Sequence, residues 1–252
     1  EVTSAQLTDI VDVLRRLWRG EMILGHTGPA GSYPLLNLGA AVNDVPILLV
    51  TMSRRTLELA GRIADGVVLH TFLGDAATSE AVATVRASAE RAGRDPAAIR
   101  IWSVIATVGD ELSEEDRLRR LYGRLATYLQ GYPDVLMRAN QWNTDDLDRI
   151  RATTAFSGAT GPIDATATVE QLAELAHVIP PHWVADSAVG SAENCAAAVA
   201  HQFDLGVDSV VLHGATPSEL QPVVSAYRTL RSPDHRELPA NPGLMTARGA
   251  DL

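Results

Sequence analysis

The sequence contains no lysine, because all 21 of its Lys and Arg residues are arginine. This absence excludes a Schiff-base lysine as a nucleophile. Cysteine occurs once, at Cys195. A single cysteine excludes a disulfide framework and a cysteine metal cluster, and it is typical of a reducing cytoplasm. No apolar run approaches the ~20 residues of a membrane span. We therefore expect a cytoplasmic protein without a membrane segment.

Basic residues are also fewer than acidic ones, 21 against 31, which gives a formal net charge of −10. Such a charge argues against a nucleic-acid binder. No signal peptide is evident, and the first residue is Glu1 rather than Met, which indicates a fragment or a processed product. A chain of 252 residues is long enough for one large α/β domain with its own core.

Residues 45–71 predict a strand, a helix and a second strand parallel to the first. The apolar run Val45–Thr51 is typical of a strand buried on both faces. Ser53 or Thr56 would cap the helix that follows. Val67–Leu69 is the second apolar run. In such a βαβ unit, both strands end at the same edge of the sheet, where α/β folds bind ligands.

The residues at that edge are the candidate functional residues of this unit. They are Thr51, Met52, Ser53, Arg54, His70 and Thr71. A histidine at such an edge can donate a hydrogen bond or shuttle a proton, and the alternative is a structural histidine. Asp65, which precedes Gly66, predicts the turn into a strand rather than a catalytic acid. Gly61 lies inside the helix and predicts a close helix contact.

The rest of the chain predicts further helices and two more strands. The helices cover residues 7–18, 76–92, 111–130, 145–151, 168–178, 192–205 and 216–230. The strands are Ile99–Val108 and Val207–Leu212, and the second ends at His213. Ser4 or Thr8 would cap the first helix, and residues 25–44 predict a long loop. Four strands, each followed by a helix, fit either half of an eight-fold barrel or a short open sheet.

Three blocks of the sequence resemble one known family. They are VPILLVTMSRRTLELAGRIADGVVLHT, AGRDPAAIRIWSVIATVGDE and the region Trp183–Glu219 with SVVLHGATP. In this order the blocks resemble the luciferase-like flavin- and deazaflavin-dependent oxidoreductases, most closely the branch that uses coenzyme F420. The resemblance implies a (β/α)8 TIM barrel of which this chain covers about strands five to eight. Residues 1–231 would form this C-terminal portion of the barrel, and 232–252 a flexible tail.

The resemblance also implies a cofactor site. Met52, Ser53 and Arg54 stand where relatives place a small-residue loop against the phosphate, held by the amides of a helix N-terminus. This chain has no glycine there, so Arg54 or Arg55 would supply positive charge, and the alternative is a solvated arginine pair. His70, Thr71 and His213 would line the cofactor ring and the substrate cavity. No catalytic residue is assigned, because the family places much of its proton transfer on strands one to four.

The function implied is a coenzyme F420-dependent oxidoreductase that moves a hydride between the deazaflavin and a small organic substrate. One alternative is an FMN-dependent monooxygenase of the same fold. Another is a non-catalytic remnant that acts as a binding or assembly partner. The bare edges of a half barrel predict a dimer.

Other chemically active residue types predict structural roles. His177, His182 and His201 lack the spacing of metal ligands, so no metal site is predicted. Cys195 lies on the apolar side of a helix and is expected to be inert. Trp102 and Trp183 could stack on a flavin or pack in the core, and core packing is the preferred prediction. His26 is predicted to be a plain loop residue.

Overall fold

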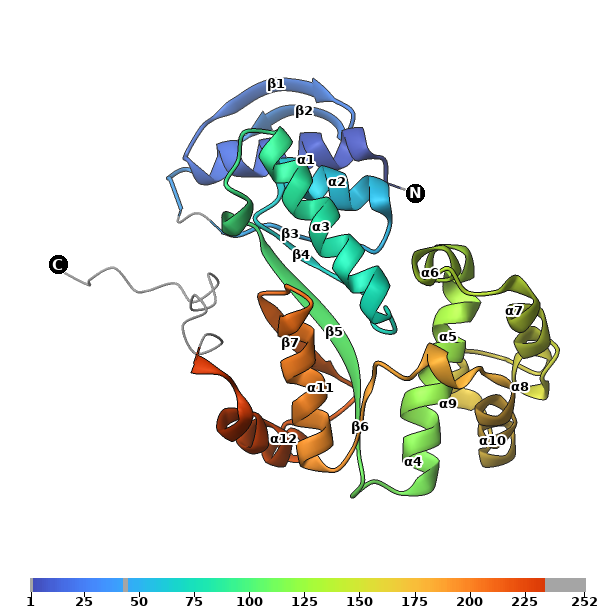
Figure 1. Ribbon diagram of the computed structural model, residues 1–252. Helices are drawn as coiled ribbons and strands as arrows, with labels where there is room; N and C mark the ends of the chain where they lie inside the picture. Colours follow the sequence, from blue (N-terminus) through green and yellow to red (C-terminus); the bar gives the residue numbers. More distant parts are fainter. Residues whose placement is uncertain (1, 43–44, 234–252) are drawn as a thin grey trace.

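The computed structural model describes residues 2–42 and 45–233 and combines a parallel sheet with a large group of helices (Figure 1). The strands are β1 Ile23–Gly28, β2 Gly31–Leu36, β3 Leu48–Val50, β4 Gly66–Val68, β5 Arg100–Gly109, β6 Ala188–Gly190 and β7 Ser209–His213. The helices are α1 Ser4–Trp18, α2 Arg54–Ile63, α3 Asp75–Arg91, α4 Glu114–Leu118, α5 Arg124–Gly131, α6 Pro133–Asn140, α7 Thr144–Arg151, α8 Thr154–Ser157, α9 Ile163–Thr166, α10 Val169–Val178, α11 Ala192–Asp204 and α12 Pro217–Leu230. Residues 234–252, most of the predicted tail, lie outside the described residues.

The main sheet is parallel throughout and centres on the long strand β5. Strand β3 pairs with β4, and β4 pairs with the first residues of β5. Strand β7 pairs with the middle of β5, and β6 pairs with its last three residues. The four strands predicted from the sequence are therefore confirmed as neighbours in one parallel sheet. The short strand β6 was not predicted, because a three-residue strand leaves no periodic signal.

Helices cover the two faces of β5 at different places. Ile101 packs with α2 and α3, and Ile105 packs with α11. Ala106 and Val108 point to the opposite face, because side chains alternate along a strand. They pack with the helical region α4–α10, which forms the largest core cluster. The helices predicted at residues 111–130, 145–151 and 168–178 lie in this helical region, which gathers to one side of the sheet (Figure 1).

Local capping explains where most of the helices begin. Ser53 caps α2, Ser113 caps α4 and Ser191 caps α11, each through a hydrogen bond from a first-turn N–H. The cap at Ser53 is one of the two predicted for α2. Helix α1 begins at Ser4, and its N-cap is Thr3, which forms a capping box with Gln6, so the predicted caps Ser4 and Thr8 are wrong. Between α4 and α5 the backbone makes a π-helical turn, so the predicted continuous helix is interrupted.

Two predictions about the first fifty residues are wrong. Residues 25–44 were predicted to be a loop, but β1 and β2 form an antiparallel hairpin around the turn at Pro29 and Ala30. Glycine and proline sit in the strands themselves, and proline is tolerated on an edge strand. Strand β3 was predicted to be buried on both faces, but Val50 is 70% exposed. The sheet therefore has an open face at β3.

No helix among the described residues is long and apolar enough to cross a membrane.

Candidate functional site

The turn after β3 presents the start of α2 to an open cavity. Ser53 accepts a hydrogen bond from the N–H of Thr56, and its own N–H binds the hydroxyl of Thr51. A helix leaves its first N–H groups without intrahelical acceptors and carries a partial positive charge at this end. The amides of Arg54 and Arg55 are thus available to an anion.

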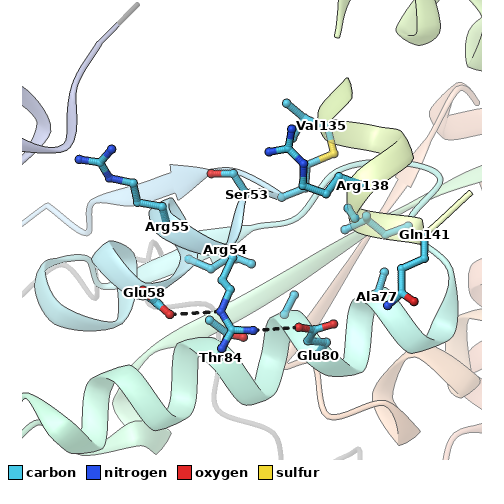
Figure 2. A pocket seen from close by; sticks show the side chains of 15 residues that line it. Ser53, Arg54, Arg55, Glu58, Ala77, Glu80, Thr84, Val135, Arg138 and Gln141 are labelled. Atoms are coloured by element: carbon cyan, nitrogen blue, oxygen red, sulfur yellow. Dashed lines mark hydrogen bonds and ion pairs between the residues drawn. The ribbon is translucent and has the colours of Figure 1, made fainter. Parts of the chain in front are cut away.

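The cavity has a volume of about 600 Å³ and lies between α2, α3 and α6 (Figure 2). That volume is within the range typical of small-molecule sites. Apolar and small side chains form much of the wall, and polar and charged groups join them. The lining residues are Met52, Ser53, Arg54, Arg55, Leu57, Glu58, Leu73, Ala77, Glu80, Ala81, Thr84, Val135, Arg138, Ala139 and Gln141.

The three arginines of the cavity differ in their partners. The Arg54 guanidinium lies between two carboxylates, 3.4 Å from Glu58 and 3.2 Å from Glu80 (Figure 2). Arg54 therefore links α2 to α3 and has its charge already compensated. Arg55 and Arg138 have no ion-pair partner within residues 2–42 and 45–233. The positive charge that the cavity offers to a ligand comes from these two side chains.

A second group of functional side chains lies at the carboxyl ends of β4 and β7. The ring of His70 contacts Tyr128 and Tyr132 edge-on, with centroid distances of 4.6 Å and 5.0 Å. Tyr128 and Tyr132 stack on each other at 5.6 Å. The Tyr128 hydroxyl is 3.4 Å from Nε2 of His213. The predicted pair of rim histidines is therefore joined through the two tyrosines of α5 and its C-terminal cap.

Hydrogen bonds fix the protonation state of His70. Its Nδ1 lies 3.0 Å from the Thr71 carbonyl, which can only accept, so Nδ1 carries the proton. Its Nε2 lies 2.8 Å from the Tyr132 hydroxyl, which donates to it. Burial lowers the pKa of His70. Burial, with the nearby Arg124, likewise lowers the pKa of His213. Both imidazoles are thus neutral near pH 7.

The backbone after His70 is strained. Phe72 has a φ of +63°, a left-handed conformation that is a genuine outlier for a bulky residue. The Asn140 side chain of α6 holds this turn, donating to the Phe72 carbonyl at 2.9 Å and accepting from the Gly74 N–H at 2.8 Å. Strain of this kind persists only where the surroundings impose it, and it gathers at functional sites.

The six residues predicted to line the cofactor site fall into these two groups. Met52, Ser53 and Arg54 line the cavity. His70 and His213 belong to the second group, which they form with Tyr128 and Tyr132 and which is called the aromatic cluster below. Thr71 is 2% exposed, and its carbonyl orients His70. The two groups are neighbours along the chain, because Phe72 contacts Tyr128 and Leu73 lines the cavity.

Tyr128, Tyr132 and Arg138 are among the residues of these groups that were not predicted. The tyrosines are four residues apart, a spacing that places them on one helix face. That spacing was the available signal, but it does not reveal that His70 lies opposite. Arg138 had no signal, because the helix that carries it, α6, was itself not predicted.

Other candidates proved structural. Trp183 is 2% exposed and stacks on Trp142 at 4.1 Å, which confirms core packing. Cys195 is fully buried, and burial raises the pKa of its thiol to about 11. Asp65 accepts hydrogen bonds from Arg15 and from the N–H of Ile47, which confirms its structural role. Within the described part of the chain, no three His, Cys, Asp or Glu side chains are arranged to hold a metal ion.

His26, expected in a loop, lies on β1. It pairs with Asp9 of α1 at 3.2 Å, and the carboxylate also accepts the N–H of Ala30. This histidine therefore fastens the hairpin to α1 and is not among the residues that line the cavity.

Comparison with known proteins points to one family. A family model described as luciferase-like monooxygenase matches residues 2–209. No curated protein sequence matches the chain.

Several solved structures share the fold. The coenzyme F420-dependent tetrahydromethanopterin reductase from Methanopyrus kandleri superposes with a TM-score of 0.65 at 16% identity, covering 89% of this chain and 60% of that one. An F420-dependent secondary alcohol dehydrogenase gives 0.56 at 16% identity, covering 90% and 64%. A riboflavin lyase with modified FMN gives 0.54 at 16% identity, covering 95% and 60%.

These likenesses confirm the predicted α/β fold of the luciferase-like type. The chain spans less than two thirds of the length of each of these structures.

Proposed function

The chain belongs to the luciferase-like monooxygenase family, and from this premise we propose that it is a coenzyme F420-dependent oxidoreductase acting on a small organic substrate. The observation that carries the proposal is the start of α2, which opens into a cavity with two uncompensated arginines. This end of a helix favours a phosphate group.

We further propose that β3, β4, β5 and β7 are strands five to eight of the family's barrel. Their order in the sheet, and the 60% coverage of the Methanopyrus reductase, support this placement. Strand β3 lies at the edge of the sheet, and this edge is then where further strands of a complete barrel would add. In this arrangement residues 1–231 form one barrel portion and 232–252 a tail.

The residues of the cavity fit the phosphate of such a cofactor. The amides of Arg54 and Arg55 would donate to its oxygens, while Ser53 holds the turn in place. Arg55 and Arg138 would offset its charge. Arg54 would act differently from the sequence-based expectation, because Glu58 and Glu80 already compensate it.

The aromatic cluster fits the ring and the substrate. His70, Tyr128 and His213 would form an uncharged wall, and the neutral state of both histidines favours an uncharged ligand there. Thr71 would contribute by orienting His70. The bound cofactor would supply the acceptor or donor of hydride, and the protein would position it and exclude water.

Titration of the purified chain with coenzyme F420, and separately with FMN, tests this function. We expect F420 to bind, with quenching of its fluorescence. Arg138→Gln should weaken binding by roughly tenfold or more, because a charge-assisted hydrogen bond contributes about 1.5–3 kcal/mol. Arg62→Gln, an exposed arginine at the far end of α2, is the matched control and should bind like the wild type.

The second candidate is an FMN-dependent monooxygenase, favoured by the monooxygenase description of the family and the FMN of the riboflavin lyase structure. An oxygen-consumption assay with FMN and an NADH-driven reductase separates it from the first. Binding of neither cofactor would contradict both enzymes and leave a non-catalytic binding or assembly partner.

A further inference from the structure

Two observations meet at one peptide in the turn between β4 and α3. The peptide that joins Thr71 to Phe72 is planar and rotates as a unit. Its carbonyl accepts the hydrogen bond from Nδ1 of His70 at 3.0 Å. Its nitrogen belongs to Phe72, whose φ of +63° measures rotation about the bond from this nitrogen to the Phe72 Cα. The orientation of His70 and the strain at Phe72 are therefore properties of the same peptide group.

This peptide has a second position with less strain. A bulky residue such as Phe72 strongly prefers a negative φ. Opposite rotations about ψ of Thr71 and φ of Phe72 carry the peptide there without moving the rest of the turn. The Thr71 carbonyl then points away from Nδ1 of His70. The Phe72 N–H makes no hydrogen bond to the described residues, so no bond on that side opposes the rotation.

The chain on both sides of the peptide is held in place. Before it, the N–H of Leu69 donates to the Trp102 carbonyl of β5 at 2.8 Å. After it, the Asn140 side chain donates to the Phe72 carbonyl at 2.9 Å and accepts from the Gly74 N–H at 2.8 Å. These two bonds fit the turn in which Phe72 is left-handed. Asn140 therefore favours the strained position of the peptide over the relaxed one.

Asn140 belongs to the helix that forms one wall of the cavity. Arg138 of α6 and Leu73 of the turn both line the cavity, and Arg138 lies on α6 two residues before Asn140 (Figure 2). A ligand that contacts both side chains fixes the turn and the end of α6 where Asn140 joins them. Before the other end of α6, the Tyr132 hydroxyl donates to Nε2 of His70 at 2.8 Å. One short helix thus connects the cavity with His70.

The tautomer of His70 depends on these hydrogen bonds. The groups that face the ring are Tyr128 and Tyr132, with His213 beyond Tyr128. The Thr71 carbonyl can only accept, so it selects the form with the proton on Nδ1. When the carbonyl turns away, nothing selects this form, and the form with the proton on Nε2 becomes accessible.

We propose that the Thr71–Phe72 peptide alternates between these two positions, and that Asn140 is the positioning residue that keeps it, and with it His70, in the strained one. A ligand in the cavity strengthens this hold through α6. The peptide is then a two-state element whose equilibrium both sites influence. The inference rests on the proposed function, in which His70 faces the substrate, and it makes the state of that wall depend on whether the cavity is occupied.

The first test is NMR of the ligand-free chain with 15N-labelled histidine rings. Asn140→Asp keeps the acceptor for Gly74 but cannot donate to the Phe72 carbonyl. The Nδ1–H fraction of His70 should fall, and its Nδ1 proton should exchange with water roughly tenfold faster or more, as expected from the strain typical of such a residue. Asn143→Asp makes the same change at the cap of α7 and should leave both readouts unchanged.

A second substitution separates positioning from general destabilisation. Glycine adopts a positive φ without strain, so in a Phe72→Gly background Asn140→Asp should have a much smaller effect on His70. Asn140→Ser, which shortens the side chain without adding charge, should act in the same direction as Asn140→Asp. An Asn140→Asp protein with the wild-type His70 tautomer and exchange rate would overturn the proposal. So would an equal effect of Asn140→Asp with and without Phe72→Gly.

The connection to the cavity is tested by adding coenzyme F420. Bound F420 should slow exchange of the His70 Nδ1 proton roughly fivefold or more in the wild type, a coupling of ordinary size between two sites. It should have little effect in Asn140→Asp. Binding of F420 to the wild type with unchanged exchange would overturn the connection through α6. Failure of F420 to bind would contradict the proposed function instead, and the ligand-free measurements would still decide whether Asn140 positions His70.

Discussion

The hydroxyl of Tyr132 decides how His70 can act. Tyr132 caps α5 and begins α6, with a backbone of φ −151° and ψ 56° that belongs to neither helix. Its hydroxyl occupies Nε2 of His70, and the Thr71 carbonyl occupies Nδ1. Burial raises the pKa of Tyr132, so the phenol stays protonated and remains a donor. His70 is therefore held as a neutral, oriented ring with no nitrogen free.

The substitution Tyr132→Phe should raise the pKa of His70. It removes the donor that favours the neutral imidazole and opens Nε2 to water. Titration of the histidine ring protons by NMR measures this pKa directly. Tyr227→Phe, which removes a partly buried hydroxyl from the stacked pair with Phe203, is the control and should leave His70 unchanged. An identical His70 titration in both variants would contradict the role given to Tyr132.

At this scale the sequence could predict residues whose role is local. Ser53 as a cap and Asp65 as a turn residue follow from neighbours a few positions away. Tyr132 could not be predicted, because its partner His70 lies 62 residues earlier. Arg54 was predicted to offer its charge, but Glu80, which takes part of that charge, comes from another helix.

Among the elements, α2 and α3 approach each other closely at Gly61. A Cβ added to Gly61 would lie 2.5 Å from the Val85 carbonyl oxygen and 2.8 Å from the Ser88 Cβ. Ser88 also donates to the Glu58 carbonyl at 2.6 Å, and Arg94 donates to the Gly61 carbonyl at 2.8 Å. The two helices are thus in backbone contact, and this contact sets the position of the cavity wall that they share.

Gly61→Ala should destabilise the protein by about 1–3 kcal/mol, because the new methyl group collides with backbone that cannot move aside. Urea unfolding measures the loss. Gly131→Ala is the matched control, since nothing lies within 4 Å of its added Cβ. We expect the control to be neutral or to stabilise by up to about 1 kcal/mol. Equal stability of the two variants would show that the helices can separate at no cost.

Element prediction succeeded where the signal is periodic and failed where it is short or mixed. Helices α3, α10, α11 and α12 and strand β5 begin and end within about two residues of their predicted limits. The hairpin β1–β2 was missed because its glycines and prolines resemble those of a loop. Its strands are stabilised by packing on α1 and by the Asp9 contacts, which the local sequence does not contain.

For the whole molecule, the sequence predicted the order of the strands but not how the sheet is covered. The family resemblance supplied the barrel type, and the family match supports it. The exposed Val50 of β3 shows that an apolar run alone does not establish that a strand is buried on both faces. An apolar residue reports that a contact is favourable, but not which segment supplies it.

One ion pair joins distant parts of the molecule and makes its stability depend on pH. His201 of α11 lies 2.6 Å from Asp75 at the start of α3. The hydrogen bond to Asp75 raises the pKa of His201, with smaller contributions from Asp204 and Asp186. A raised pKa in the folded state gives stability that is complete below the unfolded pKa, near 6.5. That stability is lost as the pH rises through the folded value.

His201→Gln should therefore lower the free energy of unfolding at about pH 5.5 and have little effect at about pH 8.5. The loss should be modest, about 0.5 kcal/mol, because the His201 side chain is 50% exposed and water screens the pair. His70 and His213 have lowered pKa values, so their contribution is present above the unfolded pKa and is lost as the pH falls. The wild type and the His201→Gln variant share this opposite pH dependence, so it cancels when their free energies of unfolding are subtracted.

In an Asp75→Asn background the same substitution should have no pH-dependent effect on the free energy of unfolding. Urea unfolding of the wild type, the two single variants and the double variant completes the cycle. If His201→Gln costs the same at both pH values, the pair contributes through packing, and its charge is irrelevant to the stability of the fold.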